Sequence, residues 1–410
     1  MNILFLTIGS MENIENKGIY TDLLRQFKDN GHNIYTVSPY EKRKGLKTVL
    51  IEQNGFSMLH VKIGNITTCG IIEKGISTVL IESQFISAIK KYFRNIRFDL
   101  VIYSTPPITF ANVISYIKKR DGAKSYLLLK DIFPQNAVDM GMMTKSGLKS
   151  AIYKFFRKKE EKLYKLSDYI GCMSQANVDF VINNNSFIDP DKVHVNPNSI
   201  EVIDYNKDTV KKKEIYAKYN IPEDAVTFIY GGNLGRPQDI PFIIECLKAN
   251  ADKSDRYFVI CGTGTEYPKL KAYVDECRPQ NVLLLNGLPK AEYEEFVKAF
   301  EVGLIFLDHR FTIPNFPSRL LSYMQAKMPV LACTDINTDI GKVIENGNFG
   351  WWCESKDPNQ FTEAVNRAIS LDLESLGNNG YEYLKKNYTV QHSYNIVSEC
   401  IKELNDNIMV

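Results

Sequence analysis

The sequence lacks the features that mark secreted, membrane-spanning and metal-binding proteins. No two of its eight cysteines have the two-residue separation of a zinc or redox motif. No stretch approaches the roughly 20 apolar residues of a transmembrane helix. The opening MNILFLTIGS has an apolar run too short for a secretory signal, and it lacks the basic lead-in and the cleavage site. We therefore expect a cytoplasmic protein whose cysteines are mostly buried thiols.

An excess of charge of one sign is also absent. Fifty basic residues face 48 acidic ones, so the net charge of +2 argues against a nucleic-acid-binding surface over the whole molecule. The 44% apolar and 24% charged residues are ordinary for a soluble globular protein. Because 410 residues exceed what one hydrophobic core usually organises, we expect two domains of roughly 200 residues each.

Short apolar runs alternate with helical patterns almost from end to end, which is typical of parallel sheets covered by helices on both faces. The expected strands are 2–7, 33–38, 98–104, 124–130, 169–174 and 192–196 in the first half, and 226–231, 257–262, 281–286, 302–307, 329–333 and 350–353 in the second.

A polar stretch with Pro197, Pro222 and a basic run separates the two series of strands. We place the boundary near Ser199, which gives a first domain of residues 1–198 together with a returning C-terminal helix, 389–410, and a second domain of residues 199–388. Open parallel sheets bind ligands beyond the carboxyl ends of their strands. Two doubly wound domains that face each other across a cleft are therefore expected.

The stretch FIYGGNLGRPQDIP, residues 228–241, runs from an apolar strand into three glycines, Arg236 and a helical pattern. Glycine lets a bulky anion approach the backbone, and the amino terminus of a helix favours a phosphate. The stretch predicts a diphosphate site at residues 232–236. A tight turn that needs positive φ explains the same residues equally well.

A second strand-to-helix loop, CGTGTEYPKL at residues 261–270, has a Gly-x-Gly pair, but Tyr267 stands where a dinucleotide fingerprint needs its third glycine. A nicotinamide or flavin cofactor is therefore not expected. The loop is either a plain turn or a segment that places Gly264 and Glu266 beside a nucleotide.

The third element is FTIPNFPSRLLSYMQAKMPVLAC, residues 311–333. Pro317 and Ser318 suit the start of a helix, which puts Arg319 in its first turn. A cation there opposes the helix dipole, and a bound anion would remove that penalty. The alternative is a surface arginine with a solvated head group.

The first half offers charged residues near expected strand ends. Lys17 and Gly18 follow the first strand in a polar loop, and Lys130 and Asp131 close the strand at 124–130. The segment 103–110, YSTPPITF, ends another strand at a similar height. Each of these is also compatible with ordinary loop chemistry.

The segment 145–166 carries eight basic residues, two glutamates and interleaved aromatic residues. It suits a helix on an anionic membrane surface, or a domain helix with a solvated basic face.

In this order the chain resembles family 4 retaining glycosyltransferases of the GT-B fold, especially bacterial enzymes that transfer amino sugars in capsule or O-antigen synthesis. The resemblance covers almost the whole chain. It is carried by KGIYTDLLRQFKDNGHNIYTVSP, LKDIFPQNAVDMG, DYIGCMSQANVDFV, VHVNPNSIEV, IYGGNLGRPQDI, VICGTGTEYPKL and FPSRLLSYMQAKMPVLA.

The resemblance implies a nucleotide-sugar donor, usually a UDP-sugar, on the second domain. It implies a saccharide or undecaprenyl-diphosphate-linked acceptor on the first, with no metal or other cofactor. It assigns catalytic roles to Asp131, Arg236 and Arg319. The donor-binding residues it implies are Lys17, Gly18, Gly232, Asn233, Gly235, Gly264, Glu266, Leu288, Ser318 and Ser322.

The chain departs from the family pattern at several positions. Pro314 and Ser322 stand where many relatives have a pair of glutamates eight residues apart, so the chain lacks the pair that recognises the ribose and the sugar hydroxyls in those relatives. Lys130 replaces a frequent histidine, and Gln238 and Asp239 stand where a lysine is common.

Two other functions stay open. A UDP-sugar epimerase of similar architecture would convert its substrate without an acceptor, and a two-domain binding protein would return its ligand unchanged.

Overall fold

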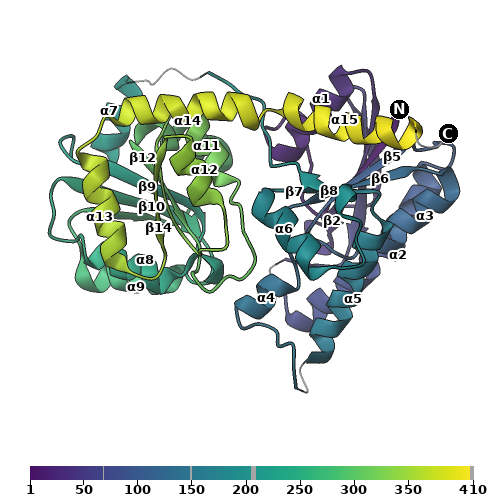
Figure 1. The fold of residues 1–410 in the computed structure, drawn as a ribbon, viewed down its shortest axis with the longest axis horizontal. Helices are drawn as coiled ribbons and strands as arrows, with labels where there is room; N and C mark the ends of the chain where they lie inside the picture. Colours follow the sequence, from purple (N-terminus) through teal and green to yellow (C-terminus); the bar gives the residue numbers. More distant parts are fainter. Residues whose placement is uncertain (68, 148–149, 205–208, 407–410) are drawn as a thin grey trace. The chain divides into compact units, whose positions relative to one another are not determined.

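The structure is a computed structural model that describes residues 1–67, 69–147, 150–204 and 209–406, and it divides into two compact units (Figure 1). Unit 1 comprises Met1–Glu201 and Thr389–Val410, and unit 2 comprises Val202–Tyr388. The sequence analysis places these boundaries after residues 198 and 388. Each unit is a doubly wound α/β structure with its own hydrophobic core.

Unit 1 contains an eight-stranded sheet with the order β3-β4-β2-β1-β5-β6-β7-β8. Its strands are β1 (Asn2–Leu6), β2 (Asn33–Glu41), β3 (Val49–Gln53), β4 (Phe56–Ile63), β5 (Leu100–Ser104), β6 (Lys124–Leu129), β7 (Tyr169–Cys172) and β8 (Val193–Val195). The order reverses between β1 and β5, which is the point where open sheets of this kind place ligands.

The sequence analysis missed the two strands β3 and β4. They form a hairpin in which Leu50 lies opposite Leu59, and β3 is the antiparallel edge of an otherwise parallel sheet. The predicted parallel sheet is therefore present in unit 1, with an antiparallel edge strand that was not expected. All five residues of β3 are exposed or half-buried, as suits a strand at the edge of a sheet.

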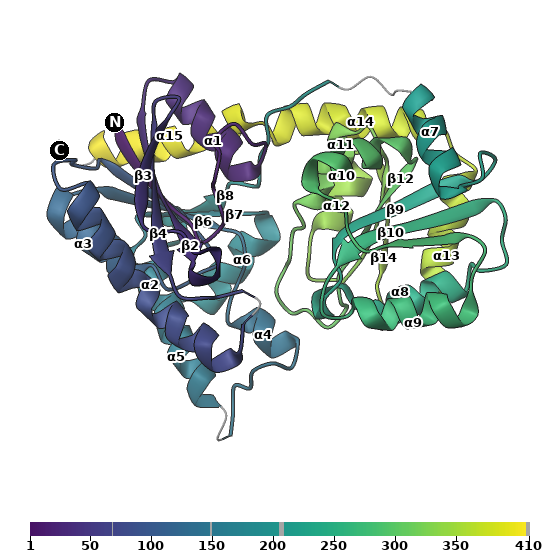
Figure 2. The same ribbon diagram turned by 180° about the vertical axis from the view of Figure 1, so that it is seen from behind.

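Helices cover both faces of this sheet: α1 and α15 pack against one face, and α2, α3 and α5 lie together on the other (Figures 1 and 2). The helices are α1 (Ile19–Asp29), α2 (Ile71–Tyr92), α3 (Ala111–Asp121), α4 (Gln135–Asp139), α5 (Ser150–Leu166), α6 (Gln175–Asn184) and α15 (Val390–Asp406), with short 3₁₀ turns η1 (Lys42–Lys44) and η2 (Pro190–Lys192).

The C-terminal helix α15 belongs to unit 1, which confirms the predicted return of the chain. The ring of Tyr394 on α15 meets Phe27 of α1 edge-on at 5.0 Å, and Val397 is fully buried in the same cluster. Ser393 donates a hydrogen bond to Oδ1 of Asn196, which follows β8. Both apolar packing and buried polar contacts therefore hold the end of the chain to the sheet.

Unit 2 contains a six-stranded parallel sheet with the order β11-β10-β9-β12-β13-β14, the 3-2-1-4-5-6 order of dinucleotide-binding folds. Its strands are β9 (Val226–Asn233), β10 (Arg256–Thr263), β11 (Val282–Leu285), β12 (Val302–Phe306), β13 (Val330–Thr334) and β14 (Gly350–Glu354). These are the six strands that the sequence predicts in the second half. Every residue of β12 and β13 is buried, as expected for central strands covered on both faces.

In unit 2, α8, α9 and α13 lie on one face of the sheet, and α10, α11, α12 and α14 on the other (Figure 2). The helices are α7 (Thr209–Tyr219), α8 (Ile240–Lys248), α9 (Tyr267–Cys277), α10 (Lys290–Phe296), α11 (Arg319–Gln325), α12 (Ile340–Asn346), α13 (Pro358–Ile369) and α14 (Leu373–Asn387), with 3₁₀ turns η3 (Arg236–Gln238) and η4 (Val297–Ala299).

All eight cysteines are free, and six of them are buried. Burial raises the pKa of Cys172 to about 12 and that of Cys261 to about 11, so these thiols stay protonated near neutral pH. Among the described residues, no helix combines the length and apolarity needed to cross a bilayer.

Replacing Phe27 with alanine should destabilise unit 1 by about 3–5 kcal/mol, because a cavity would remain between α1 and α15. Urea unfolding followed by far-UV circular dichroism measures this loss. Both tryptophans, Trp351 and Trp352, lie on β14 of unit 2, so the transition seen by their fluorescence should keep its midpoint. Phe155→Ala, at an exposed position, should change stability by at most about 0.5 kcal/mol. Equal losses in the two variants would contradict this account of the packing.

Candidate functional site

A pocket of about 690 Å³ opens in unit 2 beyond the carboxyl ends of β9 and β10. Its wall includes two consecutive glycines of β9, the segment 286–289 after β11, two residues of α10 and one of α11. The lining residues are Gly231, Gly232, Asn233, Cys261, Gly262, Thr263, Asn286, Gly287, Leu288, Pro289, Lys290, Tyr293 and Arg319.

The glycines at the end of β9 leave room for two side chains that press against the backbone. A Cβ atom on Gly231 would lie 1.9 Å from the Tyr293 hydroxyl, and one on Gly232 would lie 1.9 Å from Nη2 of Arg319. Gly232 also has a φ of +131°, which other residues rarely adopt. The turn with positive φ is therefore present at Gly232, and the diphosphate site at residues 232–236 stays a prediction.

Besides Lys290, the pocket is lined by a second cation, Arg319. It begins α11, as the sequence predicts, and its guanidinium carbon lies 4.8 Å from the centroid of the Tyr230 ring. Within the described part of the chain, no carboxylate forms an ion pair with it. A half-buried, unpaired guanidinium beside glycine backbone has the charge and the space to hold an anion such as a diphosphate.

The two glycine-containing loops of unit 2 are joined through backbone hydrogen bonds. Leu234 N donates to Thr263 O at 2.8 Å, and Glu266 N donates to Leu234 O at 2.9 Å. A Cβ atom on Gly264 would lie 2.3 Å from that same Leu234 oxygen. Gly264 and Glu266 thus hold the loop in place without lining the pocket, and the Glu266 carboxylate forms an ion pair with Lys269.

The helix after the glycine-rich loop starts later than expected. Gly235 caps only the 3₁₀ turn η3, and α8 begins at Ile240. Gln238 accepts hydrogen bonds from Gly235 N at 3.1 Å and from the Asn233 amide at 2.9 Å, which closes the turn. The helix end that would favour a phosphate at residues 232–236 therefore lies further along the chain, at Ile240. Arg236 is exposed and does not line the pocket.

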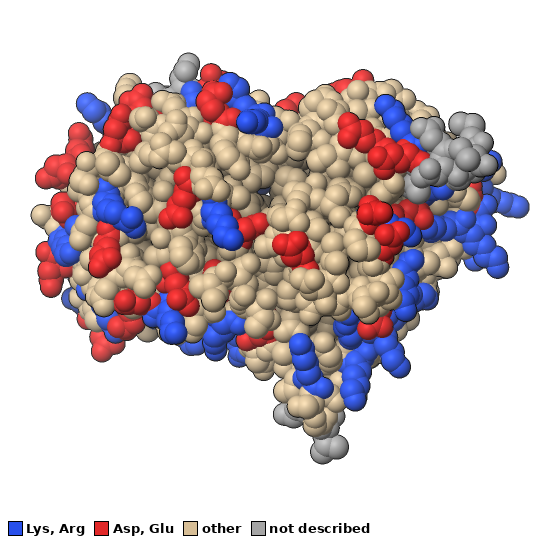
Figure 3. All heavy atoms as spheres, viewed as in Figure 1, with Lys and Arg blue, Asp and Glu red and all other residues tan. Residues whose placement is uncertain are grey.

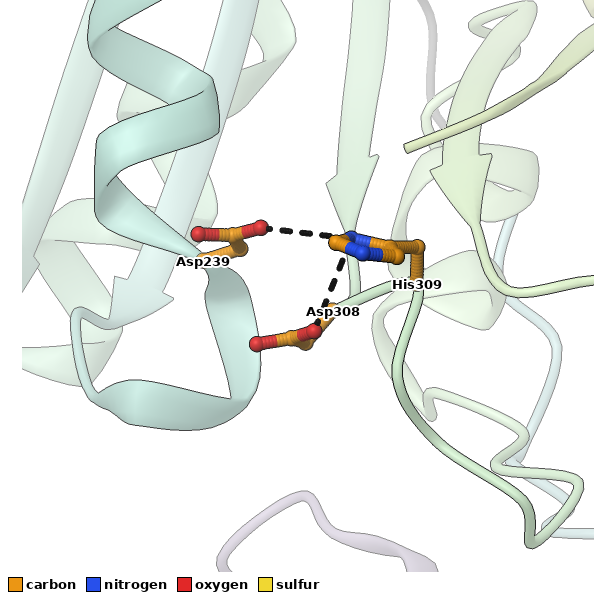
Figure 4. Close-up of side chains that lie close together, drawn as sticks. All are labelled: Asp239, Asp308 and His309. Atoms are coloured by element: carbon orange, nitrogen blue, oxygen red, sulfur yellow. Dashed lines mark ion pairs between the residues drawn. The ribbon is translucent and has the colours of Figure 1, made fainter. Parts of the chain in front are cut away.

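The true amino end of α8 lies in a charged cluster (Figure 4). Nδ1 of His309 is 3.7 Å from Oδ2 of Asp239 and 3.8 Å from Oδ1 of Asp308. Asp308 is fully buried, and Arg310 donates to both of its oxygens, from Nε at 2.9 Å and from Nη2 at 2.5 Å. Because Arg310 already neutralises Asp308, the cluster is explained as an ion-pair network that fixes the loop after β12.

In unit 1, Lys130 and Asp131 follow β6 and contact Thr105, which follows β5. The Thr105 hydroxyl accepts from Lys130 N at 3.1 Å and donates to Asp131 O at 3.1 Å. The two strand ends singled out in the sequence are therefore adjacent. Asn136 of α4 donates to both Asp131 carboxylate oxygens at 2.9 Å. Burial nevertheless raises the pKa of Asp131 to about 6 and lowers that of Lys130 to about 7.

The other predicted residues occupy turns and helix starts. Lys17 is exposed, and Gly18 precedes α1 with its N–H donating to the Asp22 carboxylate at 2.8 Å. Ser318 precedes α11, and both it and Ser322 are exposed. Of the predicted donor-binding residues, Gly232, Asn233 and Leu288 line the pocket, together with Arg319.

Tyr293 was not predicted from the sequence; its hydroxyl is buried in the pocket wall. Its segment, KAEYEEF, shows only a charged helical pattern, so nothing in the sequence pointed to a site. Tyr230 was missed as well, although its place directly before the paired glycines was a usable signal.

The two doubly wound α/β units define the GT-B fold, the two-domain architecture of many glycosyltransferases. Residues 211–385, within unit 2, match the family model described as Glycosyl transferases group 1. The chain is 25% identical over 347 residues to the probable glycosyltransferase WbjE of Pseudomonas aeruginosa. The matched region covers 82% of this chain and 81% of WbjE.

Solved structures share the whole fold at low identity. Sucrose-phosphate synthase from Thermosynechococcus elongatus gives a TM-score of 0.71 at 14% identity, covering 99% of this chain and 100% of that one. HepE from Anabaena, solved in complex with UDP, gives a TM-score of 0.69 at 13% identity, covering 98% of this chain and 100% of HepE. The structural likenesses show the fold, and the sequence matches support a glycosyltransferase function.

Gly232→Ala should weaken the binding of UDP, because the added methyl group displaces the Arg319 guanidinium. Losing charge-assisted hydrogen bonds worth about 1.5–3 kcal/mol predicts a fall in affinity of about ten- to a hundredfold, measured by calorimetric titration. Gly31→Ala is the matched control. Gly31 also has a positive φ, of +81°, but its Cβ would meet nothing within 4 Å, so this variant is strained without touching the pocket. Equal affinities in the two variants would remove Gly232 from the site.

Proposed function

We propose that this protein transfers a sugar from a UDP-sugar to a saccharide acceptor with retention of anomeric configuration. The observation that carries the proposal is the Arg319 guanidinium, which lies against Gly232 in the pocket of unit 2 and forms no ion pair with any described carboxylate. A diphosphate fits this charge and this open backbone. The match of residues 211–385 to a glycosyl transferase family supports the reaction class.

Glycosyl transfer leaves negative charge on the departing nucleoside diphosphate while the sugar becomes cationic. A donor fixed in advance stabilises that charge without reorganising, and removing one such donor in other enzymes costs about 2.7–4 kcal/mol. Arg319 is held in this way by the Tyr230 ring and by its place at the start of α11. Arg236 is proposed as a second cation that reaches the phosphates from the adjacent turn, so that no metal ion is required.

The nucleoside is assigned to the part of the pocket formed by Asn286–Pro289, where Leu288 borders the base. UDP is the proposed nucleotide because HepE, a protein of the same fold, is known in complex with it. The proposed donor sugar is an N-acetylated amino sugar, and the proposed acceptor is a saccharide on a lipid diphosphate at the cytoplasmic face of the membrane. This part rests on the resemblance to bacterial capsule and O-antigen enzymes.

The acceptor side is assigned to unit 1, where Asp131 lies beyond the carboxyl end of β6. Its ionised carboxylate would accept a hydrogen bond from the attacking hydroxyl near the reacting sugar. The buried surroundings that raise the pKa of Asp131 to about 6 also make this carboxylate a better proton acceptor near neutral pH.

Arg319→Ala should lower kcat by about 10²- to 10³-fold, because the leaving group loses its fixed cation. The same variant should lose most of the rise in melting temperature that UDP causes in the parent protein. Arg319→Lys keeps the charge but lacks the planar guanidinium. Its kcat should lie between that of the parent protein and that of Arg319→Ala. The assay follows transfer from UDP-N-acetylamino sugars to lipid-linked saccharides. An unchanged rate for Arg319→Ala would overturn the proposed site.

Conversion of the UDP-sugar without any acceptor would instead indicate an epimerase. Recovery of unchanged nucleotide sugar after long incubation with every acceptor tried would indicate a binding protein.

The pH dependence of kcat/KM should show a limb near pH 6. Because the pKa of Asp131 is raised to about 6, its carboxylate is protonated at lower pH, and activity should fall about tenfold per pH unit below that value. Asp131→Asn should be slow and should lose this limb. Asp191→Asn, at an exposed position on η2, should keep both rate and limb. A limb that persists in Asp131→Asn would assign the titration to another group.

A further inference from the structure

Helix α2 of unit 1 presents an apolar stripe to solvent. Ile76, Val79 and Leu80 are 59%, 62% and 47% exposed. Their i, i+3, i+4 spacing is that of residues that normally face a core. The opposite side of the same helix faces the core of unit 1, since Ile81 and Phe85 are buried. The helix therefore has a second apolar face that nothing in the described residues covers.

Helix α5 adds a second stripe. Ile152 and Phe155 are 58% and 46% exposed and are three residues apart on this helix. Lys159, one turn after Phe155, forms an ion pair with Glu82 of α2, with 3.3 Å between Nζ and Oε2. Glu82 lies one turn after Val79. The Lys159–Glu82 ion pair thus lies one turn beyond each stripe. Helices α2 and α5 lie side by side in both views of unit 1 (Figures 1 and 2).

The surface around these stripes is basic. Helix α5 has six basic and two acidic residues, a net charge of +4 (Figure 3 shows Lys and Arg gathered over it). The acidic groups are neutralised: Arg157 pairs with Glu160 and Glu161. Lys154 and Lys158 are exposed and have no ion-pair partner among the described residues. Lys149 of the basic segment singled out in the sequence lies outside those residues.

We infer that α2 and α5 dock unit 1 on the surface of an anionic lipid bilayer. The five apolar side chains would enter the boundary between head groups and acyl chains, and the lysines would meet the lipid phosphates. A second copy of this chain is disfavoured as the occupant, because a two-fold contact would bring the same unpaired lysines face to face. The inference does not rest on the proposed reaction, since vesicle binding is measured without substrate.

The test is co-sedimentation of the full-length protein with vesicles of phosphatidylcholine alone or mixed with phosphatidylglycerol. Binding is expected only to the anionic vesicles, and high salt should weaken it. Val79→Gln/Leu80→Gln should bind at least about tenfold more weakly, because it removes two apolar side chains without changing charge. Lys154→Gln/Lys158→Gln should also bind more weakly, and its binding should depend less on salt.

The matched control is Val210→Gln/Leu371→Gln, which changes one valine and one leucine at 66% and 52% exposed positions of unit 2. It should bind vesicles like the parent, and all variants should keep the parent melting temperature. Equal losses of vesicle binding in the control and the stripe variants would overturn the inference. Failure of the parent protein to bind anionic vesicles would also overturn it. A parent dimer in light scattering that Val79→Gln/Leu80→Gln dissociates would assign the stripes to a contact between copies instead.

Discussion

The approach of the Arg319 guanidinium to the backbone of Gly232 is the constraint on which the unit 2 site depends. It excludes any side chain at residue 232, and the +131° φ of that glycine turns the chain out of β9. Gly262 on β10 faces the same constraint, since its Cβ would lie 2.0 Å from Gly232 O. Because Gly232 and Gly262 have no side chains, the backbones of β9 and β10 and the Arg319 guanidinium can pack closely together. Side chains at these two positions would prevent this packing.

The alternation of apolar runs and helical patterns was enough to predict twelve of the fourteen strands and the return of α15. The β3–β4 hairpin was missed although Asn54 and Gly55, both with positive φ, carry the usual signal of a two-residue turn. The edge strand Val49–Gln53 begins with three apolar residues, which was a second usable signal. Tyr293 could not be predicted, because its role depends on how closely α10 packs against Gly231, and that distance arises only in the folded sheet.

The start of α8 shows how local chemistry shifts a helix boundary that looks clear in the sequence. Gln238 ties Gly235 and Asn233 into a 3₁₀ turn, and Asp239 adopts a φ of +49° before the helix begins. The carboxylate of Asp239 then lies near His309 rather than near the pocket. The phosphate site proposed here accordingly relies on Gly232 and on the side chain of Arg319, and less on a helix dipole than the sequence suggested.

The relative sizes of two effects explain why an arginine at this position indicates a ligand. A cation in the first turn of a helix costs about 0.3–1 kcal/mol at most surface sites. The Tyr230 ring at 4.8 Å offsets this cost by about 0.5–2 kcal/mol, because the ring is buried and the guanidinium is half-buried. The protein alone thus gains at most about 2 kcal/mol from Arg319, whereas a fixed donor to a developing oxyanion supplies about 2.7–4 kcal/mol. The proposed contact with a bound diphosphate would supply the interaction that accounts for this residue.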